Sequence, residues 1–157
     1  MSAESIVVIE DNPDDVYFLK RAFSKAGLTN PLEFARDGDA GLKLLRAIAE
    51  KSKVEGEAVL PLFVLLDLKL PVLNGFQVLE EIRKIPELAK LVVIVLTSSD
   101  IEADILLAYE LGARSYLVKP PEPADLVAII NTVHLHASRS WLDFPDLSWV
   151  RKRPSGR

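Results

Sequence analysis

The sequence predicts an α/β fold in which one five-stranded parallel sheet is doubly wound with five helices. The first observation behind this prediction is that strand-like apolar segments alternate with helical segments along nearly the whole chain. The second is that segments 64–66 and 91–96 are apolar at every position, which is typical of strands buried on both faces of a parallel sheet. Such strands need helices on both sides of the sheet.

The expected strands are short and rich in β-branched and other apolar residues. They are residues 5–9, 31–35, 64–66, 91–96 and 115–118. The expected helices carry apolar residues at intervals of three and four. They are residues 13–27, 39–50, 74–85, 100–111 and 122–138.

Proline and glycine mark several of these boundaries. Pro13 is placed to open the first helix, because a proline at the first helical position lacks only a donor that has no helical partner. Gly27 and Gly112 stop the first and fourth helices, and Pro86 ends the third. The polar segment 51–57 is expected to be a loop, longer than such a connection usually is.

The composition indicates how many domains the chain forms, which partners are not expected and which metal ligands it can offer. A chain of 157 residues with 49% hydrophobic content is expected to form one domain. It has no run of roughly 20 apolar residues and no signal peptide, so a cytoplasmic protein without a membrane partner is expected. With no cysteine and two histidines, any metal must be held by oxygen ligands. A net charge of −4 argues against nucleic acid as a partner.

Chemically useful side chains follow four of the expected strands at their carboxyl ends. The pair Glu10 and Asp11 follows the first strand, Asp67 the third, Thr97 the fourth and Lys119 the fifth. Ligands of open parallel sheets bind beyond the carboxyl ends of the strands. Taken singly, each residue has an ordinary explanation as a cap, a strand residue or a surface lysine. Together they predict a site.

Three carboxylates in one crevice are costly unless a cation compensates their charge, and Mg²⁺ suits carboxylate and carbonyl oxygens. Lys119 and Thr97 can bond to an anion that arrives beside the metal. A carboxylate nucleophile in such surroundings is the arrangement that forms an aspartyl-phosphate. Asp67 is the best nucleophile candidate because it stands alone after a central strand.

Several short motifs occur together and in order: Glu10-Asp11, Asp67 with Pro71 and Gly75, Thr97-Ser98, Tyr116 and Lys119-Pro120. Over residues 5–138 this pattern resembles the receiver domain of two-component response regulators. The resemblance implies a flavodoxin-like receiver fold. It also implies a phosphoacceptor, not an enzyme in the ordinary sense, that takes a phosphoryl group from a sensor histidine kinase onto one aspartate and later hydrolyses it.

The resemblance further implies a role for each site residue. Asp11, Asp67 and the backbone carbonyl of Lys69 would bind Mg²⁺ directly, and Glu10 would support the ion largely through water. Thr97 and Tyr116 would form a conformational switch, and Lys119 would hold the phosphoryl group. The peptide before Pro120 is often cis in this family. Lys69 and Ser99 occupy the positions that adjust phosphoryl lifetime, and a cation at position 69 is unusual.

The domain organisation is expected to be a receiver over residues 1–138 and an aromatic tail over 139–157, with no output domain. The signal would therefore leave through the surface of the receiver. The enlarged loop at 51–57 and the tail resemble small regulators that partner bacterial phytochrome histidine kinases.

A homodimer is also expected, through the helix 100–111, the strand 115–118 and the helix 122–138. Leu106 and Leu107 are expected to face the sheet, which would leave a second apolar stripe outside. Residues proposed for this interface are Ile101, Ile105, Tyr109 and Val127. The alternative is that the tail folds over the same stripe within one chain.

Two other classes of function stay open. An aspartyl-nucleophile phosphatase fits badly, because such sites need a second acid where Lys69 stands. A receiver-like binding module that is never phosphorylated would not need the complete set of acids, hydroxyl and lysine.

Overall fold

The computed structural model describes residues 4–135. The expected end of the last helix at 136–138 and the tail at 139–157 lie outside this range. No helix within the described range is long and apolar enough to cross a membrane.

A single parallel sheet forms the centre of the protein, with strand order β2-β1-β3-β4-β5. The strands are β1 (Ile6–Ile9), β2 (Leu32–Ala35), β3 (Val64–Leu66), β4 (Val93–Thr97) and β5 (Ser115–Val118). The expected five-stranded parallel sheet is confirmed. Its order places β1 and β3, which precede the acidic residues, next to each other.

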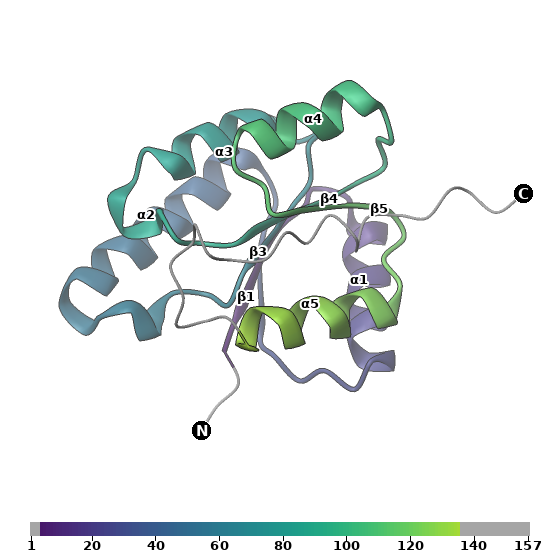
Figure 1. Ribbon diagram of the computed structural model, residues 1–157, viewed down its shortest axis with the longest axis horizontal. Helices are drawn as coiled ribbons and strands as arrows, with labels where there is room; N and C mark the ends of the chain where they lie inside the picture. The colour runs from purple at the N-terminus through teal and green to yellow at the C-terminus, as the bar shows by residue number, and fades with distance from the viewer. Residues whose placement is uncertain (1–3, 136–157) are drawn as a thin grey trace, which may run out of the picture.

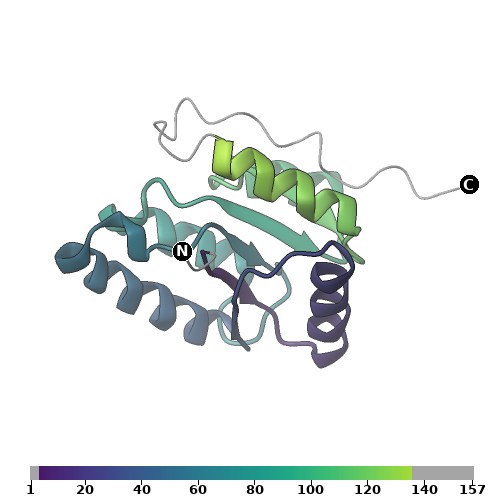
Figure 2. The ribbon, with the colours of Figure 1, turned by 90° about the horizontal axis from the view of Figure 1, so that it is seen from below.

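Five helices cover the two faces of the sheet. They are α1 (Pro13–Lys25), α2 (Gly38–Glu55), α3 (Gly75–Arg83), α4 (Glu102–Glu110) and α5 (Pro123–Leu135). Short 3₁₀ turns lie at η1 (Glu57–Val59) and η2 (Pro86–Leu88). Helices α2, α3 and α4 lie on one face, and α1 and α5 lie on the other (Figures 1 and 2). The doubly wound arrangement is therefore confirmed.

Each face of the sheet has its own hydrophobic core, because successive strand residues point to opposite sides. In β1, Val7 and Ile9 belong to the core under α2, α3 and α4, whereas Ile6 and Val8 belong to the core under α1 and α5. All four side chains are buried. Burial on both faces explains why these strands are continuously apolar in sequence.

Helix α2 corrects the expected loop at 51–57, because the helix continues to Glu55. Polar residues there favour the helix through ion pairs one turn apart: Lys53 with Glu50 at 2.7 Å and Lys51 with Glu55 at 3.9 Å. The helix stops at Gly56, whose φ of +84° suits glycine. Residues 51–55 contain no proline or glycine, and they form the solvated end of the helix.

Helix α4 corrects the expected orientation of its leucines. Leu106 and Leu107 are exposed, at 56% and 39%. Ala108 is fully buried, and Ile105 and Tyr109 pack against the core instead. The helix is apolar nearly all round, so apolar spacing alone does not select one inward face. In α5, by contrast, the expected inward stripe is confirmed: its buried residues are Leu126, Ile129, Ile130 and Val133.

Candidate functional site

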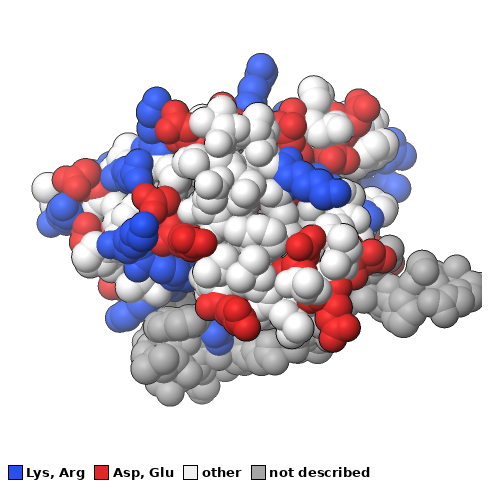
Figure 3. All heavy atoms as spheres, turned by 90° about the horizontal axis from the view of Figure 1, so that it is seen from above, with Lys and Arg blue, Asp and Glu red and all other residues white. Residues whose placement is uncertain are grey.

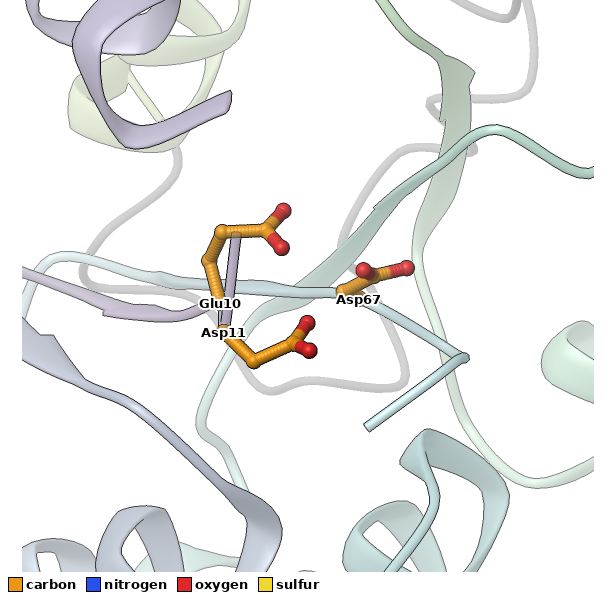
Figure 4. A group of neighbouring side chains, drawn as sticks. All are labelled: Glu10, Asp11 and Asp67. Carbon is orange, nitrogen blue, oxygen red and sulfur yellow. The ribbon is translucent and has the colours of Figure 1, made fainter. Parts of the chain in front are cut away.

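The carboxylates of the site come from two neighbouring strand ends. Ile9 and Leu66 are paired in the parallel ladder between β1 and β3. The acids that follow them, Glu10, Asp11 and Asp67, therefore leave the sheet side by side. One carboxylate oxygen from each of the three lies within 4.8 Å of the other two. Figure 4 shows Glu10 and Asp11 extending toward the side on which Asp67 lies.

Burial makes this acidic cluster electrostatically costly. Glu10 and Asp67 are buried, whereas Asp11 is exposed. Burial, together with the charge of Asp67, raises the pKa of Glu10 to about 7, although hydrogen bonds from Lys119 and from the Asn12 amide act in the opposite direction. Oxygen donors crowded in this way are suited to a hard divalent cation, which relieves their repulsion. The donor set fits Mg²⁺.

Lys119 enters the site from the end of β5, and its side chain is only 11% exposed. Its ammonium forms an ion pair with Glu10, and it lies 3.1 Å from Asp67 Oδ2 and 2.7 Å from Asp15 Oδ2. Burial alone would lower the pKa of this ammonium, but the bonds to Asp15 and Glu10 and the charge of Asp67 outweigh it and raise the pKa. The peptide between Lys119 and Pro120 is cis, as expected.

Asp15 is the one member of this group that the sequence did not reveal. It lies in the first turn of α1, where an acid ordinarily serves the helix dipole. Helix α1 starts directly after the β1 loop, because Asn12 caps it by accepting the amides of Asp14 and Asp15, and Pro13 follows the cap. This tight start turns Asp15 toward Lys119. Helical periodicity counted from Pro13 shows that an acid in this first turn could face the site. It does not show whether that acid is Asp14 or Asp15.

Thr97 ends β4, next to β3 in the sheet. Its side chain is fully buried, and its Oγ1 has no hydrogen-bond partner among the described residues. A buried hydroxyl without a partner costs about 1–3 kcal/mol, and such groups are retained where they serve a ligand. The hydroxyl is available to an incoming oxygen atom.

Tyr116 lies in β5 with its ring fully buried. Its hydroxyl donates a 2.7 Å hydrogen bond to the Ser99 carbonyl, two residues after Thr97. Burial, with smaller effects from the charges of Asp104 and other nearby acids, raises the pKa of this phenol, so it remains a donor. The Ser99 hydroxyl in turn donates to Asp104 Oδ2 in α4, also at 2.7 Å.

The loop from β3 to α3 holds Asp67 by its backbone. The Lys69 amide lies 3.3 Å from Asp67 Oδ1, and the Lys69 side chain is exposed. The Leu73 amide donates to the Pro71 carbonyl around Val72, whose φ is +72°, so this is a strained three-residue turn. A side chain at Gly75 would come within 2.3 Å of the Asp67 carbonyl oxygen, so the loop closes tightly there.

A model of the response regulator receiver domain matches residues 6–131 of this sequence. The chain belongs to this family. Two relatives show how close the likeness is. The probable methanogenesis regulatory protein FilR2 of Methanothrix harundinacea is 37% identical over 128 residues, 82% of this chain and 79% of that protein. The response regulator Rcp1 of Synechocystis is 31% identical over 128 residues, 82% of this chain and 84% of Rcp1.

Solved structures agree with this assignment. The bacteriophytochrome response regulator AtBRR superposes with a TM-score of 0.69 at 35% identity, covering 83% of this chain and 92% of that one. The Mn²⁺-bound form of Rcp1 superposes with a TM-score of 0.62 at 31% identity, covering 90% of this chain and 96% of that one. Structural neighbours of this receiver thus include regulators of the phytochrome-associated type.

In this receiver, the residues expected at the interface differ in their exposure. Ile101 is exposed just before α4, whereas Ile105 and Tyr109 are partly buried against the core. Val127 is partly buried in α5, in the opposite helical layer from α4. Of these four residues, only Ile101 is exposed.

Proposed function

We propose that this response regulator accepts a phosphoryl group on Asp67, in a Mg²⁺-dependent reaction, from a sensor histidine kinase. One observation carries the proposal: the Asp67 carboxylate lies both in the acidic cluster and 3.1 Å from the Lys119 ammonium. The carboxylate therefore has cation-binding groups on one side and a cation on the other. Phosphoryl transfer depends on such positioning and charge neutralisation.

In the proposed transfer, an Asp67 oxygen forms a bond to phosphorus while the bond from phosphorus to the donor nitrogen or oxygen breaks. The electron pair of that bond leaves with the donor. Asp11, Asp67 and the Lys69 carbonyl would hold Mg²⁺ directly, and Glu10 would hold it largely through water. The bound ion would neutralise charge on the phosphoryl oxygens. Lys119 would bond to a phosphoryl oxygen.

The proposed switch uses the hydroxyl of Thr97 and the ring of Tyr116. The absence of a partner for Thr97 Oγ1 among the described residues supports it, since a phosphoryl oxygen on Asp67 would supply the missing acceptor. Movement of Thr97 would displace the following loop, which includes the Ser99 carbonyl bonded to Tyr116. The switch would thus pass from the site to α4.

The proposed partner is a histidine kinase, and a bacteriophytochrome is the specific expectation. The likeness to AtBRR and to Rcp1 supports this choice. A cytoplasmic location, a receiver bounded at 1–138 and a signal that leaves through the receiver surface belong to the same proposal.

A homodimer through α4, β5 and α5 is the second part of the proposal. The burial pattern supports a different set of contact residues from the one expected: Ile101, Leu106 and Leu107 are the exposed apolar residues in and before α4. Figure 3 shows the face covered by α2, α3 and α4, where uncharged residues fill much of the middle. Phosphorylation could bias association there, since α4 follows the Thr97 loop.

Incubation with acetyl phosphate or phosphoramidate tests the proposed reaction. With Mg²⁺, intact mass should show one added phosphoryl group, and chelation by EDTA should prevent it. Asp11→Ala should weaken both metal binding and phosphorylation. Transfer that survives complete chelation would contradict the metal role, and a wild-type chain that never gains a phosphoryl group would favour a constitutive binding module.

A further inference from the structure

The Lys119 ammonium is fully committed to acidic partners. A lysine ammonium has three N–H donors and no acceptor. In this structure the three donors face three carboxylates, those of Glu10, Asp15 and Asp67. A new acceptor, such as a phosphoryl oxygen, can be bonded only if one of these three is released.

Asp15 differs from the other two partners. Glu10 and Asp67 belong to the cluster whose oxygens lie within 4.8 Å of one another, and Asp15 does not. Asp15 comes from α1, 104 residues before Lys119, and its side chain is 32% exposed. A cation that draws on Glu10 and Asp67 therefore leaves the bond between Asp15 and Lys119 in place.

We propose that Asp15 is a positioning residue that holds the Lys119 ammonium beside Asp67 after Glu10 and Asp67 have turned to the metal. This inference rests on the proposed function. A mostly buried ammonium that lost every partner would pay a large desolvation cost or swing toward solvent. One retained carboxylate prevents both, and it leaves the other two N–H groups free for phosphoryl oxygens.

Asp15→Asn tests this role, because asparagine keeps the shape and one acceptor oxygen but loses the charge. Asp14→Asn is the matched control, since Asp14 is an exposed acid one residue earlier in the same turn. Amide spectra would verify that both variants are folded. Asp15→Glu, which keeps the charge on a longer side chain, should recover most of any loss caused by Asp15→Asn.

The first readout is the exchange rate of the Lys119 ammonium protons, measured by ¹H–¹⁵N NMR with and without Mg²⁺. We expect protected protons in the wild type and in Asp14→Asn under both conditions. In Asp15→Asn, exchange should become faster, with the larger change in Mg²⁺. Equal exchange rates in the wild type and Asp15→Asn would overturn the proposal.

The second readout is the affinity for beryllofluoride, a phosphoryl mimic, at saturating Mg²⁺. Asp15→Asn should weaken binding by roughly three- to tenfold, the range of one partly exposed charge-assisted hydrogen bond. Unchanged or tighter binding would also overturn the proposal. A wild-type chain that binds no beryllofluoride would instead contradict the proposed function, and the exchange rates without metal would still test the hold of Asp15 on Lys119.

Discussion

The Tyr116 hydroxyl donates a 2.7 Å hydrogen bond to the carbonyl oxygen of Ser99. Ser99 follows Thr97 by two residues, and its own hydroxyl donates to Asp104 in the first turn of α4. Hydrogen bonds from Ser99, two residues after Thr97, therefore connect the end of β4 both to Tyr116 and to α4. Any displacement of Thr97 changes the geometry on which both Tyr116 and α4 depend.

Thr97→Val is expected to abolish the response to a phosphoryl mimic without lowering the stability of the fold. The substitution keeps the side-chain shape and removes a buried hydroxyl that has no partner in the described part of the chain. The free energy of unfolding of the metal-free protein should stay equal or rise by about 1 kcal/mol. Spectral changes on adding beryllofluoride and Mg²⁺ should be lost. Thr132→Val, in α5, is the control and should respond as the wild type does.

Lys69→Asn is expected to change the lifetime of the aspartyl-phosphate. Lys69 follows Asp67 by two residues with its side chain exposed, so the ammonium can stand at the path of the attacking water. The half-life should change several-fold, about 1 kcal/mol in the barrier to hydrolysis. Decay of the phosphorylated protein, followed by intact mass, measures it. The same decay in both proteins would show that position 69 has no part in lifetime.

Gly112→Ala is expected to destabilise the receiver at the end of the sheet opposite the site. Gly112 has φ +103°, and an added Cβ would lie 2.5 Å from Arg83 Nε. The guanidinium of Arg83 donates to the carbonyls of Gly112 and Leu91, at 2.7 and 3.1 Å. Urea unfolding should show a loss of about 2–3 kcal/mol, the sum of backbone strain and displaced contacts.

Gly27→Ala is the control for this steric effect. Gly27 also has positive φ, +71°, but an added Cβ would meet nothing within 4 Å. Gly27→Ala should lower the free energy of unfolding by only about 1 kcal/mol. Equal losses at both glycines would show that crowding against Arg83 contributes nothing.

Leu106→Glu combined with Leu107→Glu should give a monomer if α4 forms part of a dimer interface. Both leucines are exposed, so the substitutions should leave the core intact. Glutamates at Ile105 and Tyr109 would instead disturb residues that pack on the core. Light scattering at micromolar concentration, with and without beryllofluoride, would show whether each protein is a monomer or a dimer. A wild-type chain that is monomeric in both conditions would refute the dimer.

The sequence predicted the sheet and the grouping of side chains at its strand ends for identifiable reasons. Strands buried on both faces must be apolar throughout, and parallel strands bring their carboxyl ends to one edge, so Asp67, Thr97 and Lys119 could be grouped before any contact was known. Contacts that depend on the facing of a helix could not be predicted in this way. Asp15 resembled an ordinary first-turn acid, and α4 was apolar nearly all round.

The length of α2 shows a further limit. Segment 51–57 is polar because that part of the helix is solvated, and polarity alone does not distinguish a solvated helix from a loop. The spacing of Lys51 and Lys53 from glutamates one turn away, with which they form ion pairs, is what indicates a helix here.

The most direct test of the central claim is to locate the phosphoryl group. After reaction with acetyl phosphate and Mg²⁺, borohydride reduction converts an aspartyl-phosphate to homoserine, which fragmentation mass spectrometry can place in the sequence. We predict conversion at Asp67 alone, and none in Asp67→Asn. Conversion at Asp11 or Asp15, or equal phosphorylation of the Asp67→Asn variant, would contradict the assignment of Asp67 as the phosphoacceptor.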